Sequence, residues 1–252
     1  MAYERRYDEP EPQRVNRWLA QAGVCSRREA EDLIAQGRVQ IDGARVEDPG
    51  RKIAPGQTLT IEGFGEEGAA AAVSIVLNKP IGFVSAQPEP GEIPAVRLLT
   101  KETQRGAGAV PDRTASLPAL GRLDKESRGL LILSSDGVLA KAIIGPASRI
   151  DKEYVVEVTG FMSDRKLALL RHGLELDGRR LKPAQVTLIG AHTLRFVLNE
   201  GRKRQIRRMC DLVDLHVSDL LRVRIGPLHL SDLPEGKWRY LTPAERAALI
   251  GK

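Results

Sequence analysis

The stretch "GRLDKESRGLLILSSDG", residues 121–137, places one carboxylate among cations directly ahead of an apolar run. Asp124 lies between Arg122 and Lys125, and residues 130–133 read Leu-Leu-Ile-Leu. An apolar run of this length, bounded by turn residues, is typical of a buried strand. A carboxylate beside cations stays ionised and oriented, so it can act as a nucleophile or a base. The stretch therefore predicts a rigid strand with a reactive carboxylate at its mouth, and an ordinary turn aspartate is the alternative.

The composition indicates a globular protein with a polyanionic partner. The chain has 252 residues, of which 42% are hydrophobic and 29% charged, enough for a sizeable core. Its net charge of +6 favours a polyanion as partner. Cys25 and Cys210 form no CxxC pair, which favours a reducing cytoplasm over a disulfide framework. Because we find no signal segment and no run of about 18 apolar residues, we expect a soluble cytoplasmic protein without membrane attachment.

The first quarter of the chain predicts a small module. Residues 1–12 are charged and contain prolines, which is typical of a flexible tail. In residues 13–62, "RVNRWLAQAG" and "SRREAEDLIAQG" predict two short helices, and "RVQIDGARV" predicts a hairpin around Asp42 and Gly43. The Gly- and Ala-rich residues 63–72 predict a linker to the rest of the chain.

Residues 73–252 predict a larger α+β domain. Strands are expected at "VSIVLNKP", "EYVVEVTG", "AQVTLIG" and "TLRFVLNEG", and helices at "SDGVLAKAII", "SDRKLALLRHG" and "RKRQIRRMCDLV". Ser163 is the expected N-cap of the second helix, and a last helix opens with "TPAE", where Thr242 and Glu245 form a capping box. The strands come in neighbouring groups rather than in strict alternation with helices. This order favours a mixed, largely antiparallel sheet flanked by helices. Residues 101–118, with "RGAGAVPDRTAS", predict a long mobile loop.

Two basic clusters are candidate phosphate contacts. The first lies on or beside the two short helices, partly at a helix start, where the macrodipole disfavours cations. The second fills "EGRKRQIRRMC", on a helix whose other side is apolar, and the guanidinium fork suits phosphate. A solvated basic face is the alternative for both clusters. With the arginine of "GRLD", the candidate binding residues are Arg14, Arg17, Arg27, Arg28, Arg38, Arg122, Arg202, Lys203, Arg204 and Arg208.

Several kinds of site are missing from the sequence. It has no GxxxxGK[ST] loop for a nucleotide, and its four histidines form no HxxxH or HExxH pair. With two isolated cysteines, a zinc site has few possible ligands. We therefore expect chemistry that uses carboxylate, arginine, tyrosine or lysine, with no metal and no cofactor.

Four motifs together are similar to one enzyme family. "GRLDKESRGLLILSSDG", "LNKPIGFVS", "DKEYVVEV" and "EGRKRQIRRMC" resemble the RsuA/RluB/RluE/RluF family of ribosomal RNA pseudouridine synthases, and are most similar to its RluF branch. The segment "RVNRWLAQAGVCSRREAEDLIAQGRVQIDG" resembles the small αL-type RNA-binding module of this family. The resemblance covers about residues 14–250, and it implies a pseudouridine-synthase catalytic domain after the module.

The resemblance implies an isomerisation without a cofactor. The N-glycosidic bond of a uridine breaks, the uracil turns, and a bond to its carbon 5 forms. Asp124 then corresponds to the catalytic aspartate, which either attacks the sugar C1′ or removes a sugar proton. Tyr154 corresponds to the active-site tyrosine, and Arg207 to the basic residue paired with the aspartate, with Arg208 as its competitor. Leu130, or a neighbour in the apolar run, is expected to pack beside the base.

The resemblance also implies the partner. We expect large-subunit 23S ribosomal RNA, free or in an assembly intermediate, and the small-subunit 16S RNA or transfer RNA are alternatives. A second hypothesis is an RNA-binding or ribosome-assembly protein without turnover. Asp124, Tyr154 and Arg207 separate the two hypotheses, because a pure binder does not need this trio. We expect a monomer, since no long apolar surface repeat is present.

Overall fold

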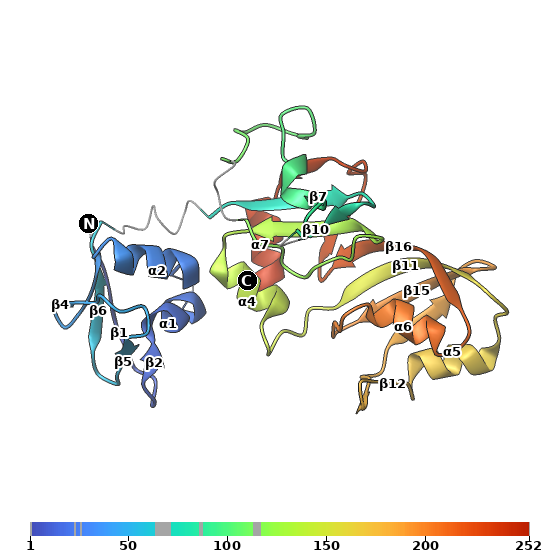
Figure 1. Cartoon of the computed structure of the whole chain (residues 1–252), viewed down its shortest axis with the longest axis horizontal. Helices are drawn as coiled ribbons and strands as arrows, with labels where there is room; N and C mark the ends of the chain where they lie inside the picture. Colours follow the sequence, from blue (N-terminus) through green and yellow to red (C-terminus); the bar gives the residue numbers. More distant parts are fainter. Residues whose placement is uncertain are drawn as a thin grey trace.

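The computed structural model describes residues 2–22, 24, 25, 27–63, 72–85, 88–112 and 117–251, which form two units (Figure 1). The predicted linker, 63–72, lies almost entirely outside the described residues, and so does the side chain of Arg28. Among the described residues no helix is both long enough and apolar enough to cross a membrane.

The N-terminal unit packs two helices on small sheets. One sheet has the order β1-β6-β3-β4, and β2 pairs with β5. Trp18 and Leu19 are buried in its core with apolar residues of the strands. The predicted hairpin is confirmed, because Asp42 and Gly43 have φ angles of 49° and 80° between β3 and β4. The elements are β1 (Tyr3–Arg6), β2 (Gln13–Arg14), α1 (Val15–Gln21), α2 (Arg27–Ala35), β3 (Val39–Ile41), β4 (Ala44–Arg45), β5 (Lys52–Ile53) and β6 (Thr58–Ile61).

The prediction of a flexible tail at residues 1–12 is wrong for its first half. Residues Tyr3–Arg6 pair antiparallel with β6 and form an edge strand of the sheet. Tyr7 is 1% exposed, and its ring meets Trp18 edge-on with 5.2 Å between the centroids. Edge strands commonly carry charged side chains, so the charges that suggest disorder in the sequence fit an edge strand equally well.

The larger unit is an α+β domain around one mixed sheet, as predicted. The strand order is β14-β15-β11-β16-β10-β7-β18, in which β10 and β16 are parallel and all other neighbours antiparallel. Its strands are β7 (Ser74–Lys79), β8 (Phe83–Val84), β9 (Ile93–Pro94), β10 (Arg128–Ser134), β11 (Lys152–Thr159), β12 (Glu175–Leu176), β13 (Arg179–Arg180), β14 (Gln185–Leu188), β15 (Thr193–Leu198), β16 (His216–Ile225), β17 (Leu228–His229) and β18 (Trp238–Tyr240). Its helices are η1 (Ala95–Leu98), α4 (Gly137–Ile144), α5 (Asp164–Arg171), α6 (Gln205–Asp211) and α7 (Pro243–Ile250).

The sheet consists of two halves joined by a short parallel pairing. β10 and β16 are in register at only two positions, Arg128 with Leu221 and Gly129 with Arg222. Gly129 has a φ of 105°, and a Cβ there would lie 2.4 Å from the Arg222 carbonyl oxygen, so this approach requires glycine. One core lies under α5 and α6 in the β11-β15-β16 half, and two others cover the faces of β10 and β7. Figure 1 shows β7 and β10 on one side of the junction and β11 and β15 on the other.

The predicted loop at residues 101–118 is ordered where the structure describes it, which contradicts the mobile loop expected from its glycines. The backbone of Arg105 donates to the Trp238 carbonyl at 2.7 Å, and Trp238 donates back to Thr103 at 3.1 Å. The hydroxyl of Tyr240 donates to the Ala109 carbonyl at 2.7 Å. The loop is therefore fastened along β18, and residues 113–116 lie outside the described part.

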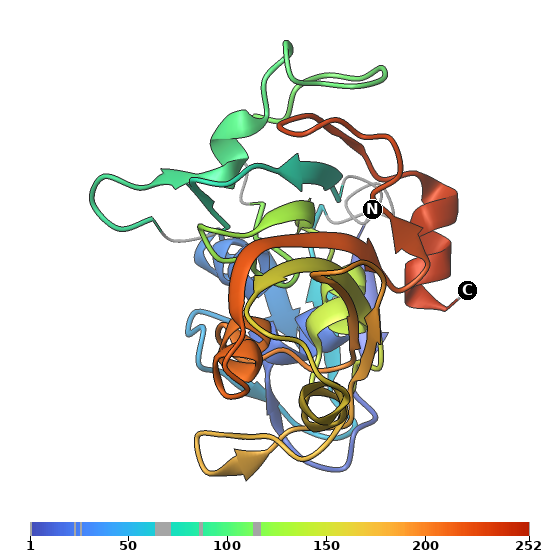
Figure 2. The same cartoon turned by 90° about the vertical axis from the view of Figure 1, so that its right-hand side faces the viewer.

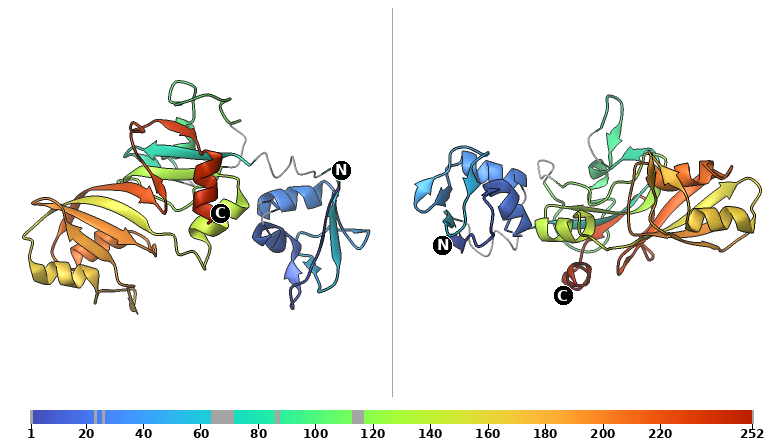
Figure 3. Two further views of the ribbon diagram at one scale, coloured as in Figure 1. Left: turned by 180° about the vertical axis from the view of Figure 1, so that it is seen from behind. Right: turned by 90° about the horizontal axis from the view of Figure 1, so that it is seen from below.

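The two units meet where α1 faces α4 (Figures 1 and 3). The ammonium of Lys141 donates to the carbonyl of Gln21 at 3.1 Å. A Cβ at Gly137, the first residue of α4, would lie 3.5 Å from the Cys25 carbonyl oxygen. Close backbone approach and one charge-assisted hydrogen bond thus place the helices of the small unit against the first turns of α4.

Candidate functional site

The loop that carries Asp124 is fastened at both ends. The amide of Leu123 donates to Ser85 Oγ at 2.8 Å, and the same hydroxyl donates back to the Leu123 carbonyl at 2.7 Å. Further along, Ser127 donates to the Asp124 carbonyl at 3.0 Å and closes a turn just before β10. The predicted strand is confirmed, since β10 begins at Arg128 and Leu131 is fully buried. The aspartate therefore lies in a short, well-anchored loop at the mouth of a rigid strand.

Asp124, Tyr154 and Arg207 line the same cavity, whose volume is about 770 Å³. They come from the loop before β10, from β11 and from α6 respectively. Asp124 and Tyr154 are half-buried, and Arg207 is 9% exposed. Arg122 and Lys203 also line the cavity and are exposed. The structure thus brings together residues that are more than 80 positions apart in the chain.

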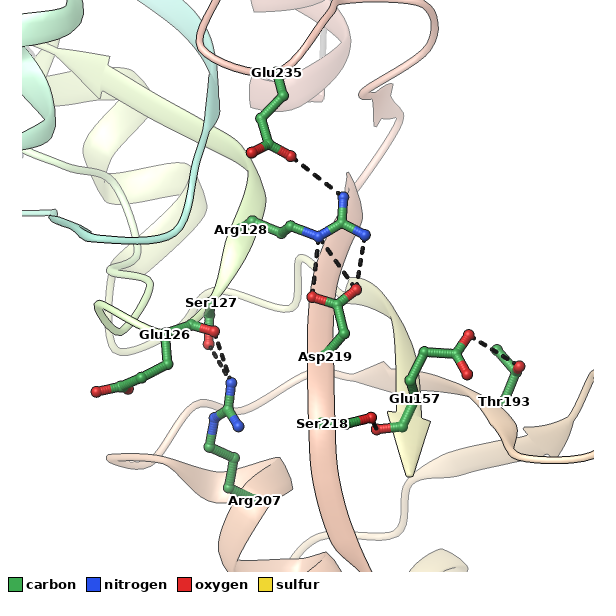
Figure 4. Close-up of polar contacts among 9 residues, drawn as sticks. All are labelled: Glu126, Ser127, Arg128, Glu157, Thr193, Arg207, Ser218, Asp219 and Glu235. Atoms are coloured by element: carbon green, nitrogen blue, oxygen red, sulfur yellow. Dashed lines mark hydrogen bonds and ion pairs between the residues drawn. The ribbon is translucent and has the colours of Figure 1, made fainter. Parts of the chain in front are cut away.

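Arg207 binds the turn that follows Asp124, through the Glu126 carbonyl and the Ser127 hydroxyl (Figure 4). Its Nη2 donates to the Glu126 carbonyl at 2.9 Å and to Ser127 Oγ at 3.4 Å, and its Nη1 donates to the Val217 carbonyl at 3.1 Å. Within the described part of the chain, its buried Nε has no hydrogen-bond partner. Among the described residues no ion pair joins Arg207 to Asp124, so the expected pairing is not formed. The guanidinium instead fixes the turn that carries the aspartate.

Tyr154 lies where two cores meet. It is on β11, where it pairs with Phe196 of β15 and Arg222 of β16, next to an irregularity in the β16 register at Glu153. Its ring packs against both the core under α6 and the core beside β10. The tyrosine therefore bridges the two halves of the sheet and presents one side to the cavity that Asp124 lines.

Leu130 is not placed where we expected it. It is fully buried in the core beneath α4 and α7, and the cavity lining does not include it. Successive residues of a strand point to opposite faces, and both faces of β10 are covered, so its apolar run fills cores. The prediction that Leu130 contacts the base is therefore wrong, whereas Leu198 and Leu220, from β15 and β16, line the cavity.

Buried cations that sequence reasoning missed support the Asp124 loop. Arg222, 1% exposed, donates to the Gly121 carbonyl at 2.9 Å and to the Leu130 carbonyl at 2.7 Å. Lys79, fully buried, donates to the carbonyls of Pro80 and Phe83 at 2.9 and 2.7 Å. Burial lowers the pKa of Lys79 to about 8, partly offset by Asp124 and Glu126. An ionisable residue inside an otherwise apolar strand, as in "LLRVRIG" or "IVLNKP", is the sequence signal that identifies such groups.

Ion pairs join the same two halves of the sheet. Arg128 of β10 binds Asp219 of β16 with two parallel hydrogen bonds, Nε to Oδ1 at 2.9 Å and Nη2 to Oδ2 at 2.7 Å (Figure 4). Glu235 adds a third contact to the guanidinium at 3.5 Å. Hydrogen bonding with Asp219 raises the pKa of Arg128. Together with Arg207 and Arg222, this pair ties the β16 half to the loop before β10.

The arginines predicted to bind RNA fall into two groups. Those of the N-terminal unit, Arg14, Arg17 and Arg27, are exposed, whereas Arg38 donates to the Glu62 carbonyl at 2.9 Å. In the second cluster Lys203 is exposed. The other members of that cluster have protein partners. Arg202 donates to three backbone carbonyls. Arg204 forms an ion pair with Glu126, and Arg208 forms one with Asp177. Three of the four predicted phosphate ligands in this cluster are therefore already bound to protein.

A metal site has no support in the geometry. Among the residues that the structure describes, no three His, Cys, Asp or Glu side chains gather in a metal-binding arrangement. The burial of Cys25 and Cys210 raises the pKa of both thiols to about 12, so both are protonated at neutral pH.

Comparison with known proteins identifies the fold and the family. The sequence model of RNA pseudouridylate synthases matches residues 73–212, and that of the S4 domain matches residues 13–59. This chain belongs to the RNA pseudouridine synthase family. The carboxylate, tyrosine and arginine at one cavity are thus the candidate active site of a pseudouridine synthase, and its N-terminal unit is an S4 domain.

Individual relatives of this pseudouridine synthase span most of both chains. An uncharacterised RNA pseudouridine synthase of Aquifex aeolicus is 34% identical over 242 residues, covering 94% of this chain and 93% of the relative. The dual-specificity RNA pseudouridine synthase RluF of Escherichia coli K12 is 33% identical, and the match covers 92% of this chain and 76% of RluF. The ribosomal large subunit pseudouridine synthase B of Bacillus subtilis is 32% identical, and the match covers 92% of this chain and 93% of the relative. A crystal structure of a pseudouridylate synthase superimposes on this chain with a TM-score of 0.65 at 24% sequence identity. The superposition covers 94% of this chain and 99% of the other, so the two share the same fold.

Proposed function

We propose that this enzyme converts a specific uridine of large-subunit ribosomal RNA to pseudouridine, with Asp124 as the reactive carboxylate. The observation that carries the proposal is the convergence of Asp124, Tyr154 and Arg207 on one cavity. A relative named as a ribosomal large subunit enzyme supports the choice of RNA. The net charge of +6 suits a polyanionic substrate.

The geometry supports a division of roles for an isomerisation. The target uridine leaves its stack to reach the cavity, at a cost of a few kcal/mol. Asp124 acts on the sugar while the C1′–N1 bond breaks. After the uracil turns, a C1′–C5 bond forms and the C5 proton is lost while N1 regains one, so the atoms balance. Tyr154 stacks on the uracil, and Arg207 fixes the backbone of Glu126 so that the carboxylate loop keeps its position.

The S4 domain supplies binding in this proposal. Arg14, Arg17 and Arg27 are exposed and free to contact phosphates, which position an RNA without reading its sequence. We propose that the enzyme works as a monomer in the cytoplasm, on free RNA or on an assembly intermediate of the large subunit.

The test is isomerisation of unmodified large-subunit RNA, mapped by carbodiimide-dependent reverse-transcription stops. Wild-type protein should give a new stop at a defined uridine, and Asp124→Asn should give none while its affinity for the RNA changes less than about threefold, since the substitution removes only the charge. Wild-type activity on small-subunit or transfer RNA alone would overturn the choice of substrate. The name of the dual-specificity relative makes transfer RNA the second substrate to assay.

A further inference from the structure

The hairpin formed by β12 and β13 projects from the enzyme beside α6 (Figures 1 and 2). Its turn is Asp177-Gly178, with φ angles of 55° and 70°, the left-handed values of a tight two-residue hairpin turn. Leu176 and Leu181 are buried at its base, whereas the turn and the arginines of β13 are exposed. Two-stranded hairpins are marginal in water, and this one needs other support.

Two arginines of the segment before and within α6 supply that support. Arg202 donates to the carbonyls of Leu176, Arg179 and Arg180 at 2.8, 3.2 and 3.0 Å. Arg208 binds both carboxylate oxygens of Asp177, at 2.9 and 2.6 Å. We call these contacts the arginine clasp. They fasten both strands and the turn of the hairpin to the segment that also carries Arg207.

Three cationic side chains of the hairpin segment have no ion-pair partner among the described residues, although the amide of Lys182 donates to Glu200 Oε1 at 3.1 Å. Arg179, Arg180 and Lys182 are exposed, and Lys182 lines the cavity with Lys203. Over the part of the chain that the structure describes, no carboxylate lies within ion-pair distance of the side chains of Arg179, Arg180, Lys182 or Lys203. Glu175 is the residue in register with Arg180 on the neighbouring strand. Like charges on one short segment repel each other, and an anion at the hairpin would relieve that repulsion.

We propose that the β12–β13 hairpin is a phosphate-binding arm for the RNA strand that flanks the target nucleotide. Arg179, Arg180 and Lys182 contact the sugar-phosphate backbone beside the cavity, and Arg202 and Arg208 are positioning residues that hold the arm. The proposal rests on the proposed function, because it takes RNA as the substrate. Arg202 and Arg208 are already bound to protein, so in this proposal the phosphates are bound by the hairpin that these two arginines support.

The first test removes two charges from the arm. Arg179→Ala/Arg180→Ala is compared with Arg97→Ala/Arg165→Ala, which removes two exposed arginines that do not line the cavity. With a transcript of large-subunit RNA, the hairpin variant should raise the half-saturating enzyme concentration about tenfold and lower the salt slope of binding by roughly 1.5. The maximal single-turnover rate should stay within about twofold of wild type. Equal behaviour of the two variants overturns the proposal.

The second test addresses the arginine clasp. Asp177→Asn removes one negative charge and keeps a residue that tolerates the left-handed turn. If charge alone governed binding, the variant would bind RNA more tightly than wild type. If the arginine clasp positions the arm, the variant should instead bind RNA more weakly than wild type, because a loosened arm loses affinity despite the added net positive charge. Unchanged or tighter binding shows that the arm needs no clasp and overturns the positioning role.

The outcomes separate this proposal from the proposed function. If wild-type protein isomerises the ribosomal transcript and the hairpin variant matches its control, only the arm is refuted. If wild-type protein forms no pseudouridine on the transcript, the proposed substrate is refuted. The arm is then still tested by the salt dependence of equilibrium binding, measured with the same transcript and with transfer RNA.

Discussion

Arg222 on β16 donates a hydrogen bond of 2.9 Å to the carbonyl of Gly121, three residues before Asp124. Its Nε also donates to the Leu130 carbonyl at 2.7 Å, on the far side of the same loop. One buried guanidinium therefore spans both ends of the segment that carries the reactive carboxylate. With Arg207 at Glu126, it makes the position of Asp124 depend on the other half of the sheet.

Replacement of this guanidinium should slow the reaction more than it weakens binding. Arg222→Met removes both hydrogen bonds and should lower the maximal single-turnover rate at least tenfold, with a change in half-saturation below about threefold, because a small misplacement of a reacting group has large effects. Arg222→Lys, which can restore one of the two bonds, should recover part of the rate. Thermal unfolding of each variant gives the folded fraction at the assay temperature. A rate loss fully explained by unfolding would show a structural role only.

Local patterns in the sequence predicted the elements that local forces build. Thr242 and Glu245 form the expected capping box of α7, and Ser163 caps α5. The apolar run at residues 130–133 became the buried strand β10. Each of these depends on neighbours within a few positions, which the printed sequence displays directly.

What the sequence did not predict depends on contacts between distant segments. The cavity walls join residues that no spacing rule relates, and the order of the strands in the large sheet is set by packing. Arg202 and Arg208 resemble free phosphate ligands in the sequence, but the carbonyls and the carboxylate that they bind lie more than 20 positions away. Charge density in a sequence shows where cations are, and only the fold shows which of them already have partners.

The ion pair between Arg128 and Asp219 should stabilise the junction of the two half-sheets. The side chains are 31% and 25% exposed, and the bonds are bidentate. A double-mutant cycle with Arg128→Met and Asp219→Asn should give a coupling free energy of about 1 to 2 kcal/mol in urea unfolding. The matched control is Arg6 with Asp8, which are 69% and 79% exposed, and their coupling should be below about 0.5 kcal/mol. Equal coupling in the two pairs would contradict a role for burial at the junction.

The two thiols should resist alkylation in the native state. Cys25 and Cys210 are 8% and 0% exposed, and burial raises the pKa of both to about 12. At pH 8 about one thiol in ten thousand is ionised, and only the thiolate reacts. Iodoacetamide at pH 8 should therefore leave the folded protein unmodified and label both cysteines in denaturant, as mass spectrometry would show. Rapid labelling of one cysteine without denaturant would mean that its surroundings open readily.

The stability of the protein should depend on pH through Lys79. Its pKa is about 8 in the folded protein and 10.5 when unperturbed. Below pH 8 the amine is protonated in both states, so the folded protein bears the cost of a buried charge. Between pH 8 and 10.5 the unfolded chain holds more protons than the folded one, and stability rises with pH wherever that is so.

A comparison with Lys79→Met isolates this contribution. The free energy of unfolding of wild type minus that of the variant should be flat below about pH 7. It should then rise by up to about 3 kcal/mol by pH 10.5, at 1.36 kcal/mol per pH unit over the interval between the two pKa values. Urea unfolding at half-unit steps of pH measures it, and other titrating groups cancel in the difference. A difference that stays constant from pH 7 to 10.5 would mean that Lys79 titrates alike in both states, so that its ammonium is as well solvated against the Pro80 and Phe83 carbonyls as in water.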